Sequence, residues 1–282
     1  MKLSLAKYHG WGNDFLVADG AELPATVDRS GLARRLCDRR RGIGADGLLF
    51  SAPSAGYTAS MTLFNADGSL AMMSGNGIRC FAYELARRAQ SLAEQTILTD
   101  SGPRTVTLAA TERADTIDAS VGMGPVLSIA APNGWDNIGA HPDRPVAHLS
   151  LGNPHTVVGV DDVTVVDLVQ LGRTVPETNL EIIEPGPEPN AVTMRVHERG
   201  AGLTEACGTG ACASAWAAVS WGLVPASADE VVVHMDGGSA KVRLHHPASG
   251  EVTLTGPAVF VGTIHIELDL DDSNLVASSV DA

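Results

Sequence analysis

The chain has 282 residues, enough for one large domain or two medium-sized ones, and 44% of them are hydrophobic, which excludes a mainly disordered, collagen-like or coiled-coil protein. Its 33 acidic residues outnumber 19 basic ones, and the net charge of −14 argues against binding to nucleic acid or to an anionic membrane. No apolar run approaches the roughly 18 residues of a membrane span, and the start lacks the apolar stretch of a signal peptide, so we expect a cytoplasmic protein with a small-molecule partner.

The first half of the chain reads as short strands with two helices. Ser30 is expected to cap a surface helix over Gly31–Arg40. Strands are predicted at Gly47–Phe50, which is continuously apolar, and at Thr58–Phe64, where polar and apolar residues alternate. A second helix begins near Gly75, because the apolar residues that follow it recur with helical spacing.

The second half repeats this mixture. Alternating residues predict strands at Val192–His197 and Ala240–His245, and an apolar run predicts another at Val231–Val233. A third helix is expected from Gly208 to Gly222, and its residues are small or apolar on nearly every side. A helix that is apolar all round is typically buried on all sides.

The two later helices begin with the same pattern, which indicates an internal duplication. Residues 74–77 read SGNG and residues 207–210 read CGTG. A Gly-Asn pair precedes each of them, at residues 12–13 and 152–153, in the same order. The period is far longer than that of a solenoid, so we expect two similar domains that face each other, with a boundary near residue 120.

The paired glycine turns have a chemical interpretation. A helix that begins after such a turn presents free backbone N–H groups, which bind anions, and Cys207 at this position is expected to have a lowered thiol pKa. Two such helices would hold one carboxylate and place a side chain on each face of its α-carbon. One group would remove the α-proton and the other would return a proton, as in a racemase. The alternative is that both turns are ordinary glycine-assisted helix starts.

The sequence resembles the diaminopimelate epimerases, which work without pyridoxal phosphate. The motifs that carry the resemblance are HGWGNDF at residues 9–15, RRRGIGADG at 39–47, NADGS at 65–69, GNGIRC at 75–80, GNPH at 152–155 and HERGAGLTEACGTGACA at 197–213. The resemblance implies an α+β fold of two pseudo-symmetric domains, each a β-barrel-like sheet around a central helix. The N-terminal domain would span 1–120, with a C-terminal strand over 264–282 returning to it, and the C-terminal domain 121–263. The resemblance also implies no cofactor, no metal and a homodimer.

Two catalytic positions follow from the resemblance. Cys207 matches the acid/base of the C-terminal domain, whereas Ser74 stands where the family carries its other catalytic cysteine. An alcohol is a far weaker acid than a thiol, so this change puts proton transfer at Ser74 in question. Three interpretations stay open: an engineered Cys-to-Ser trap, a natural serine that relays a proton through a neighbour, or a changed reaction.

The resemblance also implies the substrate-binding residues. Arg199 would grip the far carboxylate of a diacid, Glu198 would meet the reacting ammonium group, and His155 would lie close to the catalytic groups. The other implied binding residues are the donors at the two helix starts and the asparagines that line the pocket: Gly75, Asn76, Gly208, Thr209, Asn13, Asn65, Asn153 and Asn179.

Two other patterns have structural interpretations. Residues 42–47, GIGADG, match a dinucleotide-binding pattern, but a basic helix precedes them and a strand follows, so we expect a turn in which Asp46 bonds to its own backbone. Cys207 and Cys212 have poor spacing for zinc, and Cys212 is expected to pack within its helix.

The predicted function is the epimerisation of LL-2,6-diaminopimelate to the meso form, in lysine and peptidoglycan precursor biosynthesis, with activity impaired by Ser74. One alternative is another amino acid racemase, or a hydroxyproline-type epimerase or dehydratase. Another is an amino acid-binding protein without turnover.

Overall fold

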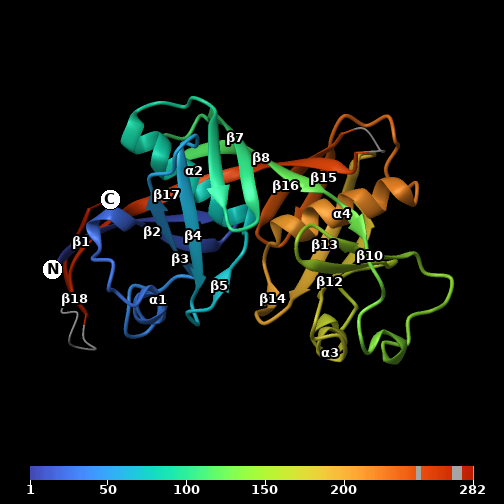
Figure 1. Ribbon diagram of the computed structural model, residues 1–282. Helices are drawn as coiled ribbons and strands as arrows, with labels where there is room; N and C mark the ends of the chain where they lie inside the picture. The colour runs from blue at the N-terminus through green and yellow to red at the C-terminus, as the bar shows by residue number, and fades with distance from the viewer. Residues whose placement is uncertain (246–248, 269–274, 282) are drawn as a thin grey trace. The chain divides into compact units, whose positions relative to one another are not determined.

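The computed structural model describes residues 1–245, 249–268 and 275–281. The chain forms two compact units, one from Met1–Val121 together with the chain from Pro257 onward, the other from Gly122–Gly256 (Figure 1). Of the strand predicted over 264–282, residues 269–274 and 282 lie outside the described residues. In the described part of the chain, no helix has both the length and the apolar character needed to cross a membrane.

Eight strands of the first unit pair in a closed ring, which makes a β-barrel. In ring order they are β17 (Glu251–Leu268), β1 (Lys2–Gly10), β2 (Asn13–Asp19), β3 (Gly47–Ala52), β4 (Ala59–Asn65), β6 (Gln95–Thr99), β7 (Gly102–Ala110) and β8 (Thr116–Pro125), and β8 pairs with β17. The pairs β2–β3 and β4–β6 are parallel. Two further strands, β5 (Leu70–Ala71) and β18 (Leu275–Asp281), pair with β4 and β17.

Helix α2 (Gly75–Ala89) fills the barrel of the first unit. It contacts β1, β2, β3, β4 and β7, and nearly all of its residues up to Ala86 are buried. Gln90 ends it in the left-handed region, with φ of 50°, and its N–H bonds back to the last turn. The helix predicted to begin near Gly75 is therefore confirmed.

Helix α1 (Arg29–Cys37) corrects one prediction. Ser30 is not the cap: Asp28 accepts the hydrogen bond of the first turn at 2.9 Å, and Ser30 lies inside that turn. The helix also stops at Cys37 instead of Arg40, because the Asp38 carboxylate accepts the backbone N–H groups of Arg40 and Arg41, at 2.7 and 2.9 Å, and turns the chain.

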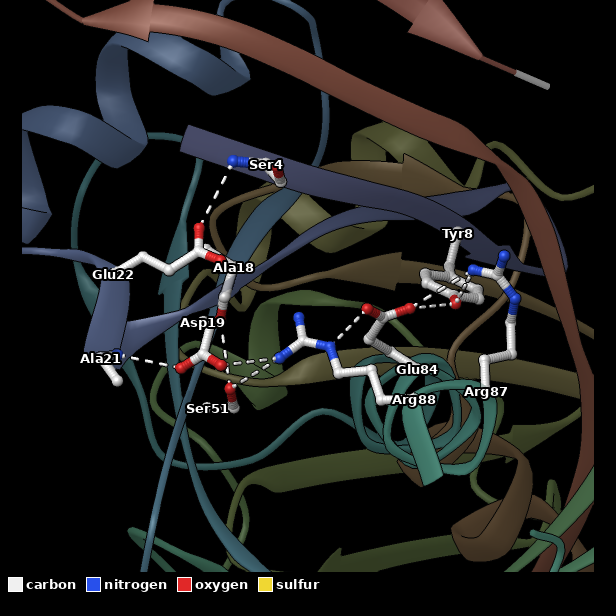
Figure 2. Close-up of polar contacts among 10 residues, drawn as sticks. All are labelled: Ser4, Tyr8, Ala18, Asp19, Ala21, Glu22, Ser51, Glu84, Arg87 and Arg88. Atoms are coloured by element: carbon white, nitrogen blue, oxygen red, sulfur yellow. Dashed lines mark hydrogen bonds and ion pairs between the residues drawn. The ribbon is translucent and has the colours of Figure 1, made fainter. Parts of the chain in front are cut away.

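A buried carboxylate anchors the C-terminal end of α2, as Figure 2 shows. Glu84 accepts hydrogen bonds from the Tyr8 hydroxyl at 2.5 Å and from Arg88 Nε at 2.6 Å. Arg87 donates to the Tyr8 oxygen at 3.0 Å, and Arg88 also pairs with Asp19 at 3.1 Å. Burial and the Glu84 charge raise the pKa of Tyr8 far above its ordinary value, so Tyr8 stays a neutral donor.

Replacing Glu84 with glutamine should lower the free energy of unfolding by about 2 kcal/mol, because it weakens charge-assisted hydrogen bonds to a buried partner. Urea unfolding followed by circular dichroism measures this. Glu94→Gln, a change at an exposed loop position, is the control and should unfold like the unmodified chain. Coincident curves for all three proteins would contradict the anchoring role.

The second unit repeats the architecture of the first. Its strands pair in the order β9 (Leu127–Ser128), β10 (Val146–Ser150), β11 (Pro154–Gly159), β12 (Asn179–Pro185), β13 (Ala191–Glu198), β15 (Val231–Met235), β16 (Gly238–Leu244) and β17, with β14 (Gly202–Thr204) beside β13. The pairs β11–β12 and β13–β15 are parallel. Helix α4 (Gly208–Ser220) lies against β10, β11, β12, β13, β15 and β16 and is mostly buried, as predicted for an all-apolar helix.

The element order confirms the duplication. In each unit a short strand leads into the buried helix, β5 into α2 and β14 into α4, and a strand parallel to the preceding long strand follows it. Helix α3 (Leu168–Thr174), capped by Asp167, was not predicted. It is seven residues long and contains Gly172, so its helical signal is weak.

Candidate active site

The first helix start places Ser74 in a polar network of the first unit. Ser74 caps α2, and its Oγ accepts the Gly77 N–H at 3.0 Å. Asn76 donates to Asn13 Oδ1 at 3.1 Å and accepts from Arg79 at 3.0 Å. Arg79 also donates to the carbonyl of Gly75, the first residue of α2, at 3.0 Å. The structure thus brings the predicted residues Gly75, Asn76 and Asn13 together beside Ser74.

Asp46 holds Asn13 in place, which corrects the prediction for the 42–47 turn. Its carboxylate accepts from Asn13 Nδ2 at 2.7 Å, from the Asp14 N–H at 3.0 Å and from Arg39 at 2.7 Å. Asp46 therefore does not bond to its own backbone. It supports an asparagine of the candidate site from a neighbouring loop, a contact that only the tertiary fold creates.

Asn65 lies apart from this network. It is exposed at the end of β4, and its amide donates to Ser69 Oγ at 2.9 Å. The hydrogen bonds of the described residues connect it to its own turn, not to Asn13 or Asn76.

At the second helix start, as at the first, the cap side chain accepts a backbone N–H group, but here the cap is a thiol. Cys207 caps α4, and its Sγ accepts the Gly210 N–H at 3.3 Å. Thr209 Oγ1 lies 3.5 Å from that sulfur, and Asn153 Nδ2 donates to Thr209 at 3.2 Å. Gly208 is the buried first residue of α4. The predicted residues Cys207, Gly208, Thr209 and Asn153 therefore gather at one helix N-terminus.

Three more predicted residues lie on the strands around this helix start or directly after them. Glu198 ends β13, and its carboxylate accepts from Thr204 at 2.5 Å. Burial raises the pKa of Glu198, against the hydrogen bond from Thr204. Asn179 begins β12, and its Oδ1 accepts the backbone N–H of Arg199 at 2.8 Å, while the Arg199 side chain is exposed.

The environment of Cys207 reverses one prediction. We expected the helix N-terminus to lower the pKa of this thiol, but burial and the carboxylates of Glu198 and Glu181 raise its pKa well above the ordinary value. The N–H of Gly210 and the hydroxyl of Thr209 act in the opposite direction and are outweighed. Cys207 therefore carries its proton at neutral pH in this state.

Sequence reasoning missed Glu181. This acid lies on β12 between apolar neighbours, it is fully buried, and its Oε1 lies 2.6 Å from His155 Nδ1. His155 itself, which was predicted, is also fully buried, and its Nε2 lies 3.1 Å from Asn153 Oδ1. An acid between two apolar strand residues was the available signal, because buried charges are rare unless paired.

The cysteines and acids offer no obvious metal site. Among the described residues, no group of three or more His, Cys, Asp and Glu side chains is arranged to hold a metal ion. Cys212 is buried inside α4, which confirms its predicted packing role.

The family model and the curated relatives agree on one family. The family model for diaminopimelate epimerase matches residues 5–128 and 148–261. The diaminopimelate epimerase of Halothermothrix orenii is 37% identical, with 95% of this chain and 99% of that protein covered, and the one of Synechococcus elongatus is 38% identical, with the same coverage. A solved structure of a PhzF-family phenazine biosynthesis protein from Bacillus anthracis has a TM-score of 0.76 at 15% identity, covering 95% of this chain and 100% of that one, and so shares the fold.

Proposed function

The chain belongs to the diaminopimelate epimerase family, and from this premise we propose that it converts LL-2,6-diaminopimelate to the meso form without pyridoxal phosphate, in lysine and peptidoglycan precursor biosynthesis. The observation that carries the proposal is the Cys207 thiol at the start of α4, with Gly210 N–H, Thr209 and Glu198 around it. Cys207 is then an acid/base at the α-carbon, and Ser74 takes the second position.

Substrate binding would activate Cys207. The Glu198 charge helps to raise the thiol pKa, and an α-ammonium group against Glu198 would cancel that effect and lower the pKa. The Cys207 thiol would lose its proton to water as its pKa falls. The thiolate would then take the α-proton: the C–H bond breaks and an S–H bond forms. Backbone N–H groups at the helix starts, at Gly75, Asn76, Gly208 and Thr209, would stabilise the negative charge that develops on the carboxylate.

The second proton transfer would fall to Ser74. The carbanion would take the hydroxyl proton of Ser74 on its other face, which leaves an alkoxide in place of a thiolate. An alkoxide is far less stable in water than a thiolate. We therefore expect exchange of the α-proton at the Cys207 face to be faster than net epimerisation.

Arg199 supports a diacid as substrate. Its exposed guanidinium follows directly after Glu198, and its backbone is held by Asn179, so one carboxylate could bind there while the other centre reacts. Asn13, Asn65, Asn153 and Asn179 would line the pocket, and His155 would support Asn153.

Replacing Arg199 with lysine should raise KM for diaminopimelate about tenfold and change kcat little, because the bidentate grip on the non-reacting carboxylate is lost. Steady-state kinetics measures both. Arg195→Lys, on the strand that ends just before Arg199 but bonded to the Val163 carbonyl, is the matched control and should leave KM unchanged. A KM for Arg199→Lys equal to that of the control would remove Arg199 from the binding site.

The decisive test of the function is incubation with LL-diaminopimelate in deuterated water, followed by NMR for loss of the α-proton and formation of the meso isomer. Proline, 4-hydroxyproline and lysine serve as monocarboxylic comparisons. Exchange in diaminopimelate alone supports the proposal, and exchange confined to a monocarboxylic amino acid refutes it. A location in the cytoplasm and assembly as a homodimer remain predictions from the resemblance.

A further inference from the structure

The buried acid Glu181 forms one end of a chain of hydrogen bonds that reaches Cys207. We propose that Glu181 is a positioning residue: it makes His155 a hydrogen-bond donor at both ring nitrogens and so, through Asn153, aims the Thr209 hydroxyl proton at the sulfur. The inference rests on the proposed function only in taking Cys207 as the acid/base.

The chain has four links, all within the second unit. His155 Nδ1 lies 2.6 Å from Glu181 Oε1, and His155 Nε2 lies 3.1 Å from Asn153 Oδ1. Asn153 Nδ2 donates to Thr209 Oγ1 at 3.2 Å, and Thr209 Oγ1 lies 3.5 Å from Cys207 Sγ. Glu181 and His155 are fully buried, so water does not compete for their contact.

The direction of donation follows from the amide of Asn153. Its nitrogen donates to Thr209, so its oxygen accepts, and the facing His155 Nε2 must carry a proton. On the other side of the ring, Nδ1 lies 2.6 Å from Glu181 Oε1, and in the proposed chain Glu181 is a carboxylate that accepts, so Nδ1 carries a proton as well. A ring protonated at both nitrogens is a cation, and Glu181 is the carboxylate that balances it.

The last link decides the effect on the thiol. The Thr209 oxygen already accepts from Asn153, so its single proton is free to point at Cys207 Sγ. A hydroxyl that donates to sulfur stabilises the thiolate over the thiol. The first donor in the chain is the charged His155 ring, and charge-assisted hydrogen bonds are roughly twice as strong as neutral ones. The charge on His155 therefore strengthens the hydrogen bonds that hold the Thr209 hydroxyl.

The helix start is shaped around this carboxylate. A Cβ at Gly210 would lie 2.7 Å from Glu181 Oε1, closer than non-bonded atoms approach, and 3.3 Å from Cys207 Sγ. The glycine that donates to Cys207 thus also leaves the space that Glu181 occupies. Burying a carboxylate there costs free energy unless the carboxylate is paired, and its partner is His155.

The duplicated unit shows that the fold does not need these two side chains. In the parallel pair β11–β12, His155 lies opposite Asn179, and Glu181 follows two residues later. In the corresponding pair β2–β3, Phe15 lies opposite Gly47, and Leu49 follows two residues later. In the first unit, Phe15 and Leu49 thus occupy the strand positions that His155 and Glu181 occupy in the second unit.

For the variant Glu181→Gln, the proposal and a simple charge effect predict opposite changes in the stability of the Cys207 thiolate. Among the described residues, the carboxylates of Glu198 from β13 and Glu181 from β12 act on Cys207, and His155 from β11 acts on Glu198. If Glu181 acted only as a nearby negative charge, Glu181→Gln would favour the thiolate. In the proposed chain, glutamine removes one ring proton from His155, weakens the donor and can reverse the Asn153 amide, so the thiolate becomes less stable.

The test measures thiolate formation without any substrate. The unmodified chain and Glu181→Gln are treated with iodoacetamide over a range of pH, and modification of Cys207 is followed by peptide mass spectrometry. We expect alkylation of Cys207 in Glu181→Gln to be about fivefold slower at mildly alkaline pH. Glu184→Gln, on the same strand but bonded to the Val163 N–H, is the matched control and should react like the unmodified chain. Unchanged or faster alkylation in Glu181→Gln overturns the proposal.

Variants at Thr209 test the chain itself. Thr209→Val should slow alkylation about as much as Glu181→Gln, Thr209→Ser should restore the rate, and the double variant should be no slower than either single one. A double variant in which the two decreases in alkylation rate multiply would overturn the proposal.

If Glu181→Gln does not fold, ¹⁵N NMR of the histidine rings in the unmodified chain decides. The His155 signals are assigned by comparison with a His155→Gln sample. A His155 ring that is protonated at only one nitrogen at neutral pH overturns the proposal. A positive alkylation result without exchange in diaminopimelate would refute the proposed function and leave the role of Glu181 standing.

Discussion

Replacing Ser74 with cysteine is expected to raise the rate of epimerisation of diaminopimelate about 100-fold or more, the range in which a matched general acid/base acts. Ser74 Oγ accepts the Gly77 N–H at 3.0 Å, just as Cys207 Sγ accepts the Gly210 N–H at 3.3 Å, so a sulfur at position 74 would meet the same helix start. The thiol ionises at a pH where the alcohol does not.

The measurement is NMR in deuterated water, which follows exchange and isomer formation separately. Ser220→Cys, which adds a thiol at an exposed position at the end of α4, is the control for a non-specific effect. A large gain in Ser74→Cys would mean that the present chain is a trapped or slowed epimerase. Equal rates in the unmodified chain and in Ser74→Cys would mean that serine works in this site. No turnover in either of these two proteins would favour a changed reaction or a binding protein.

Removing the thiol of Cys207 is expected to abolish proton exchange at the α-carbon, with a loss of at least about 1,000-fold, because no other group at this helix start takes the proton. Cys207→Ser keeps a capping oxygen for the Gly210 N–H and should be as inactive as Cys207→Ala, which separates the acid/base role from the cap. Both are made in the unmodified chain and in Ser74→Cys, so that turnover is measurable.

Cys212→Ala is the matched control for this loss. Cys212 is buried in the same helix, and its removal should leave the exchange rate within a factor of about two, at a modest cost in stability. The raised pKa of Cys207 adds a pH dependence: the reactive form is the thiolate, so exchange should increase as pH rises through the alkaline range. Exchange that survives in Cys207→Ala would show that another residue is the base.

Local patterns predicted the elements that hold the site. The glycine pairs at residues 74–77 and 207–210, followed by apolar residues with helical spacing, located both buried helices to within a residue or two at their starts. The caps Ser74 and Cys207 directly precede these helices. Alternation located strands such as β13 and β16 to within two residues at each end.

The errors have two physical causes: one is a competition between neighbouring residues for the cap position, and the others depend on groups far away in the sequence. Asp28 displaces Ser30 as the cap by a shift of two residues, which propensity alone does not resolve. Asp46 turns to Asn13 and Arg39 instead of its own backbone. The pKa of Cys207 is set by desolvation and by two carboxylates on other strands, which outweigh the helix N-terminus that the sequence displays.

The ring of β-strands in the first unit has a consequence for the order in which the protein folds. Strand β17 closes that barrel between β1 and β8, yet it follows the whole second unit in the chain. During synthesis, β1 and β8 therefore emerge with one unpaired edge each. Strand β8 waits for about half of the chain, and β1 for most of it, before their partner is made. Exposed strand edges of this kind invite pairing with other chains. The second unit is uninterrupted from Gly122 to Gly256, so it has most of its strands in place before the first unit can close.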